Sequence, residues 1–112
     1  MDIIEEIVLT KQEGFDLMLQ AHIDHDTVID EDFLDKSLLK ETLENLNSGN
    51  WILFTACVTA SKEGVELGRS HYLGGCIHES LDEFKESGYL PQMVEEAISQ
   101  AKELIIKLTQ TW

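Results

Sequence analysis

The spacing of apolar residues changes several times along the chain, and each change predicts a new element. Between residues 51 and 60 every second residue is apolar, which predicts a β-strand with one core face. A turn at residues 61–64 leads into a second strand over residues 65–78, where glycines at 68 and 74–75 indicate a bulge. The middle of the chain is therefore expected to form an antiparallel hairpin.

Helical spacing predicts three helices. The first covers about residues 30–47, with Asp30 as its N-cap and Gly49 placed to end it. A capping box opens a short helix over residues 80–87, and Pro91 begins the last helix, over residues 91–110. This last helix has one wide apolar stripe, made of Met93, Val94, Ala97, Ile98, Ala101, Leu104, Ile105, Leu108 and Trp112.

Residues 1–23 fit two patterns. Apolar residues at helical spacing, followed by a capping box at residues 10–13, predict two short helices. The alternative is a hairpin, because apolar residues alternate strictly from Phe15 to Ile23 after a turn at Gly14. We expect a single α+β domain over residues 1–112, with helices on one face of a small antiparallel sheet. Two strands are marginal alone, so either the N-terminal region or a second copy adds strands.

Net charge narrows the classes of partner. The 112 residues include 22 Asp and Glu against 8 Lys and Arg, a formal net charge of −14. Such a surface repels phosphates and anionic lipids, so we expect no direct binding to nucleic acid or membrane, and attraction to basic proteins. The hydrophobic content of 43% is too high for a disordered acidic tail.

The negative charge is concentrated in one half of the chain. Residues 1–50 contain 13 acidic and 3 basic residues, against 9 and 5 in residues 51–112. Carboxylates in such a tract can imitate phosphates and occupy a basic groove, although added acidic residues also favour solubility. The predicted contact surface for a partner consists of Asp24, Asp26, Asp30, Glu31, Asp32 and Asp35.

One alternative is a zinc site formed by Cys57, His71, Cys76 and His78. His71 has the opposite strand parity to Cys76 and His78 unless the glycine bulge resets it. A catalytic Cys76 lacks an orienting third group, so buried small cysteines are the preferred interpretation. We therefore expect no metal or other cofactor.

A second metal alternative uses His22 and His25, three residues apart, with Asp24 and Asp26 supplying charge. The tract does not match a calcium loop, because it lacks the central glycine and the bidentate glutamate at position twelve. A solvated acidic connection is the simpler interpretation of these residues.

Motifs of catalysis and targeting are missing from the sequence. It has no glycine-rich phosphate loop and no G-x-S-x-G elbow, and Arg69 is its single arginine. It also has no stretch typical of a signal peptide or membrane helix. We expect a cytoplasmic protein that is not an enzyme.

The central block of residues 58–68, followed by Tyr72-Leu73-Gly74-Gly75-Cys76, resembles a pattern in small proteins encoded by phages and prophages. The resemblance covers about a third of the chain. It implies an anti-defence context, such as anti-CRISPR activity, in which small acidic proteins block nucleic-acid sites of host or defence enzymes.

The leading hypothesis is thus a non-enzymatic acidic binding module, an inhibitor resembling DNA that occupies the basic nucleic-acid-binding surface of a host or defence protein. The alternative is a small structural or regulatory protein that forms a homodimer through an apolar strand face or the terminal helix. A metal-dependent sensor or enzyme is a third possibility.

Overall fold

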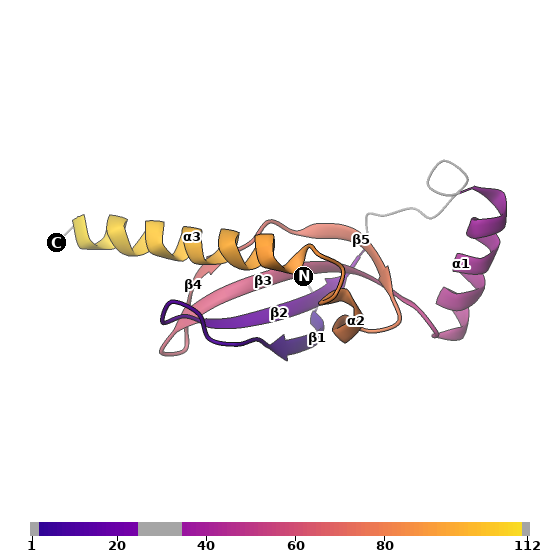
Figure 1. The fold of residues 1–112 in the computed structure, drawn as a ribbon, viewed down its shortest axis with the longest axis horizontal. Helices are drawn as coiled ribbons and strands as arrows, with labels where there is room; N and C mark the ends of the chain where they lie inside the picture. Colours follow the sequence, from indigo (N-terminus) through magenta and orange to yellow (C-terminus); the bar gives the residue numbers. More distant parts are fainter. Residues whose placement is uncertain (1–2, 25–34, 111–112) are drawn as a thin grey trace.

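The computed structural model describes residues 3–24 and 35–110, which form a five-stranded antiparallel sheet and three helices (Figure 1). The α+β class is confirmed. In chain order the elements are β1 (Ile3–Val8), β2 (Asp16–Ile23), α1 (Lys36–Ser48), β3 (Ile52–Lys62), β4 (Val65–Arg69), β5 (Leu73–His78), α2 (Leu81–Phe84) and α3 (Leu90–Gln110).

Strand β3 is the centre of the sheet. One edge of β3 pairs with β2, and the other pairs with β4 near Lys62 and with β5 near Ile52. Residues 54–60 are all buried, and the predicted core face is confirmed, because Phe54, Ala56, Val58 and Ala60 belong to the hydrophobic core. A strand paired on both sides has little exposed backbone, and here its polar face is also covered by neighbouring side chains.

The predicted second strand is interrupted at residues 70–72, which separate β4 from β5. Ser70 holds this break against β3, because its N–H donates to the Val58 carbonyl and its hydroxyl accepts from the Val58 N–H. Gly74 and Gly75 lie within β5, and Gly75 has a positive φ of 68°.

Residues 3–23 form a hairpin, so the prediction of two short helices is wrong and the alternative is confirmed. Strands β1 and β2 pair antiparallel, with Ile7 opposite Leu19 and Val8 opposite Met18. The capping-box residues instead belong to the connecting turn, where Glu13 and Gly14 both have positive φ. The alternating apolar residues after Gly14 bury one complete face of a strand in the core. This burial favours the hairpin over the helices that the spacing before Gly14 predicts.

Helices α2 and α3 cover one face of the sheet. The core joins Leu17 and Leu19 of β2 with Phe54 and Val58 of β3, and helical side chains such as Phe84 pack over them. Helix α2 is shorter than the predicted helix over residues 80–87, although Ser80 caps it as expected. No described helix is both long and apolar enough to cross a membrane.

Helix α3 approaches the backbone of β4 very closely at Gly68. A Cβ atom there would lie 2.1 Å from the carbonyl oxygen of Ala97 and 2.5 Å from the nitrogen of Ala101. Both of these helix residues are buried alanines, so small side chains on each side permit the contact. The apolar stripe of α3 packs on the core as far as Ile105. Near this end of the helix Leu104 and Leu108 of the stripe are 36% and 48% exposed, and their neighbour Ile106 is 56% exposed.

Helix α1 stands apart from the sheet, at the opposite end of the molecule from the C-terminal end of α3 (Figure 1). It makes no extensive packing contact with another described helix or strand. The helix begins at Lys36 with Asp35 as its N-cap, so the predicted start near residue 30 with Asp30 as cap is wrong; Gly49 ends it as expected. Asp30 itself lies outside the described residues.

A Gly68→Ala substitution is expected to lower the free energy of unfolding by about 3 kcal/mol, because the methyl group collides with helix backbone that cannot rotate away. The matched control is Gly64→Ala, where the Cβ has no neighbour within 4 Å and only a positive φ opposes it. That control is expected to cost about 1 kcal/mol. Urea denaturation measures both, and an equal loss in the two variants would contradict the close approach.

Candidate protein-binding surface

The acidic tract is held at each end by a carboxylate that bonds to the backbone. An Asp24 carboxylate oxygen accepts a 2.7 Å hydrogen bond from the Gly75 N–H in β5. At the other end, Asp35 accepts from the Leu38 N–H at 2.9 Å and from the Ser37 hydroxyl at 3.2 Å. Two of the six predicted contact residues therefore have structural roles, which their spacing in the sequence did not reveal.

The other four predicted contact residues, Asp26, Asp30, Glu31 and Asp32, lie outside the described residues. The structure adds Glu41 and Glu44 to the candidate surface, because both are exposed on α1. We call residues 24–48 the acidic arm. It contains eight acidic and two basic residues, a net charge of −6 on 25 residues.

Most cations of the described chain are already neutralised by carboxylates. Five ion pairs involve Lys or Arg: Lys11 with Asp16, Arg69 with Glu66, Lys85 with Asp82, Lys102 with Glu13, and Lys107 with Glu103. A sixth cation, Lys62, lies over the ring of Phe15. Exposed carboxylates that form no ion pair with a described residue are Glu5, Glu6, Asp35, Glu41, Glu44, Glu63, Glu79, Glu86 and Glu95. Apart from Asp35, which caps α1, these carboxylates are available to an external cation.

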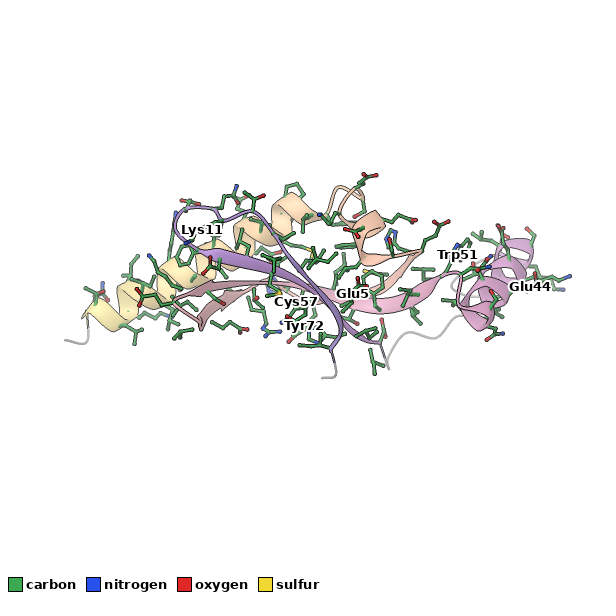
Figure 2. The ribbon with its side chains drawn as sticks, turned by 90° about the horizontal axis from the view of Figure 1, so that it is seen from below. Glu5, Lys11, Glu44, Trp51, Cys57 and Tyr72 are labelled. Carbon is green, nitrogen blue, oxygen red and sulfur yellow. The ribbon has the colours of Figure 1, made fainter. Side chains whose placement is uncertain are left out.

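A cluster around Arg69 lies on the sheet face that no described helix covers, where its guanidinium contacts the Cys57 sulfur and the Tyr72 hydroxyl; Figure 2 labels Cys57 and Tyr72. This guanidinium donates to both carboxylate oxygens of Glu66 and, at 2.8 Å, to the Tyr72 hydroxyl. These contacts with Glu66 raise the pKa of Arg69 above its usual range. Because its N–H groups already donate to Glu66 and Tyr72, the guanidinium of Arg69 has a structural role and is not available to bind an anionic ligand.

The same face holds buried polar side chains. His22 is 3% exposed and bonds to Gln20 at 3.1 Å, while the ring of Tyr72 meets its edge at 5.7 Å. Polar residues in this position could not be distinguished from solvated ones by alternation alone. These polar residues are buried because Tyr72 and Arg69, which lie later in the chain, pack on the same face.

The cysteines and histidines of the zinc hypothesis are not brought together. Cys57 lies opposite Gln20 on the helix-free face, whereas Cys76 belongs to the core under the helices. His71 is exposed and pairs with Glu96, and His78 bonds to Glu83. Across residues 3–24 and 35–110, no three His, Cys, Asp or Glu side chains form a group able to hold a metal ion. His25, of the second metal hypothesis, lies outside these ranges.

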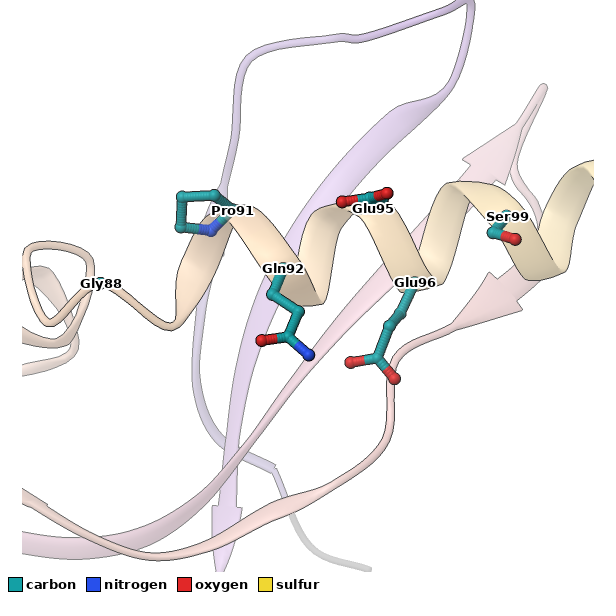
Figure 3. A pocket seen from close by; sticks show the side chains of 6 residues that line it. All are labelled: Gly88, Pro91, Gln92, Glu95, Glu96 and Ser99. Atoms are coloured by element: carbon teal, nitrogen blue, oxygen red, sulfur yellow. The ribbon is translucent and has the colours of Figure 1, made fainter.

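Open pockets occur on both sides of the sheet. Figure 3 shows the one beside the start of α3, about 630 Å³ in volume, where Gln92, Glu95, Glu96 and Ser99 meet Gly88. Its lining has carboxylates but no cation, which suits a cationic ligand better than a phosphate.

Comparison of the chain with protein-family models, with curated protein sequences and with solved structures finds no match. The candidate surface therefore depends on charge, exposure and geometry alone.

The N-cap makes the helicity of α1 dependent on pH. Hydrogen bonds from Leu38 and Ser37 lower the pKa of Asp35, so the ionised cap stabilises the helix above the ordinary aspartate pKa. This stabilisation is lost as the pH falls through the lowered pKa. The protection factors of the α1 amides, in which the intrinsic pH dependence of exchange is divided out, are expected to fall over that acidic range, and Asp35→Ala is expected to show low protection factors at neutral pH already. Unchanged exchange in Asp35→Ala would contradict the cap; Glu41→Ala is the control.

Both thiols are expected to be inert in the folded protein. Burial raises the pKa of Cys57, and it raises that of Cys76 to about 11, so little thiolate exists at neutral pH. A thiol reagent at pH 8 should react with neither cysteine until denaturant is added, and then with two per chain. Rapid reaction of one native thiol would show an accessible nucleophile and reopen the catalytic hypothesis.

Proposed function

We propose that this chain is a non-catalytic acidic binding protein that docks onto a basic surface of another protein. The observation that carries the proposal is the distribution of charge: among the described residues, most of the lysines and the arginine face a carboxylate, while nine exposed carboxylates form no ion pair. Bringing an external cation to these groups gains attraction without breaking an internal pair.

The partner class that fits best is a nucleic-acid-binding protein. The molecule measures 58 Å along its longest axis and 24 Å across the other two, so it is elongated like a short duplex. A duplex of that length carries about 34 phosphate charges. The chain carries a net −14. It therefore supplies somewhat under half of the charge, enough to compete for part of a basic groove without copying the full phosphate array.

Our proposal extends to the biological setting. The resemblance of residues 58–68 and 72–76 to small phage and prophage proteins supports an inhibitor of a host or defence protein, acting in the cytoplasm. The acidic arm is the proposed contact, because it has the highest charge density and because its helix α1 stands away from the sheet at one end of the molecule (Figure 2).

A displacement assay tests this function. Proteins of the native cell are bound to immobilised duplex DNA, the purified chain is added, and released proteins are identified by mass spectrometry. We expect stoichiometric release of a specific protein, with affinity that falls steeply as salt rises. Release no better than that by polyglutamate of equal charge would contradict the proposal.

Two variants of equal net charge locate the contact. Asp30→Lys, Glu31→Lys and Asp32→Lys together reverse the arm, while Glu63→Lys, Glu79→Lys and Glu86→Lys reverse three carboxylates elsewhere. Only the arm variant is expected to lose displacement, by more than about tenfold in concentration, with circular dichroism unchanged in both. Equal losses would assign the effect to net charge and contradict a localised contact.

A homodimer is a second candidate, and the terminal helix is the observation that favours it. Leu104, Ile106 and Leu108 are substantially exposed near the C-terminal end of α3, and Figure 1 shows that end of the helix extending past the sheet. Burying such residues between two copies would give an association that resists salt, because its free energy comes from apolar area. Light scattering in high salt distinguishes the two candidates.

A further inference from the structure

Strand β1 forms one edge of the sheet, and in the described part of the chain nothing pairs with its outer side. Its sequence, Ile-Ile-Glu-Glu-Ile-Val, places two carboxylates between apolar residues. Val8 is 76% exposed, and Ile3 and Ile4 are 45% and 46% exposed. An edge of this kind is a template for another strand, because its outward N–H and C=O groups lack partners.

Pockets lie on both faces of the sheet at the Val8 end of this edge. On the helix side, Val8, Leu9, Leu90 and Val94 line an open space of about 320 Å³ with Lys85 at its rim. On the helix-free side, Val8, Met18 and Thr59 line a space of about 410 Å³, with the carboxylates of Asp16 and Glu66 beside it. Successive side chains of an added strand point to opposite faces, so they would reach the two pockets in turn.

We propose that the outer edge of β1 accepts an extended segment of the basic partner as an additional strand of the sheet. This inference rests on the proposed function, from which it takes the positive charge of the partner. Main-chain hydrogen bonds to residues Glu5–Val8 hold the segment, since the register shift near Ile3 leaves this run regular. Two adjacent Lys or Arg residues of the segment lie opposite Glu5 and Glu6, and apolar residues of the segment lie opposite Ile7 and Val8.

Charge complementarity selects this occupant over a second copy of the chain. In an antiparallel pair of β1 strands related by a two-fold axis between Glu5 and Glu6, each glutamate would face a glutamate of the other copy. Like charges directly opposite are destabilising, whereas Lys or Arg in the same places is stabilising. No described residue forms an ion pair with either glutamate, so their charge is available to the incoming segment.

The test uses four blocked peptides and the full chain, with affinity measured by chemical-shift titration of the backbone amides. The probe is Val-Val-Lys-Lys-Val-Val, which complements the charge pattern of β1. Its controls are Lys-Val-Val-Val-Val-Lys, of identical composition, Val-Val-Glu-Glu-Val-Val, and the probe with every backbone nitrogen methylated. We expect the probe to bind at least about tenfold more tightly than each control, with shifts at β1 and slowed exchange of its amides.

A pair of variants separates the edge from general attraction. Glu5→Gln with Glu6→Gln is expected to weaken the probe about three- to tenfold, whereas Glu79→Gln with Glu86→Gln, of equal charge change outside both β1 and the acidic arm, leaves it unaltered. Equal binding of the probe and its methylated form overturns the strand pairing but leaves the proposed function standing. Tight, sequence-selective binding of the probe without displacement of any DNA-binding protein upholds the edge and overturns that function.

Discussion

The close contact between α3 and the backbone of β4 at Gly68 is the constraint on which the rest of the structure depends. Because a helix lies directly against the strand there, one face of the sheet is closed over Phe54, Val58 and their neighbours. The opposite face then has to be covered by side chains, and Arg69 and Tyr72 do this over Cys57. With both faces occupied near the centre, binding is left to the periphery: the acidic arm, the end of α3 and the edge at β1.

Much of this architecture could be predicted from the spacing of residues. The central strand, the Ser80 cap, the final helix and the end of α1 at Gly49 follow from local patterns that tertiary packing also favours. The N-terminal region could not be decided locally, since its first residues fit a helix as well as a strand. Only pairing with β3, through β2, resolves that ambiguity, and such pairing joins residues far apart in the sequence.

The candidate surface was harder to predict because a carboxylate in a sequence does not reveal its role. Asp24 and Asp35 belong to the same acidic tract as Asp30, yet each bonds to a backbone N–H that folding places beside it. Arg69 likewise gave no sign of its bidentate partner. Composition can state how much charge a chain has, but only geometry shows which part of it is already used internally.

The hydrogen bond from Gly75 to Asp24 spans 51 positions of sequence. During synthesis the acidic arm leaves the ribosome long before residue 75 is added. The N–H group that bonds to Asp24 is therefore still missing when β1 and β2 are already available to pair. Contacts of such long separation form late because a large loop must close first. The most highly charged part of the chain is thus anchored only after β5 has joined the sheet, which delays a competent acidic surface until the fold is nearly complete.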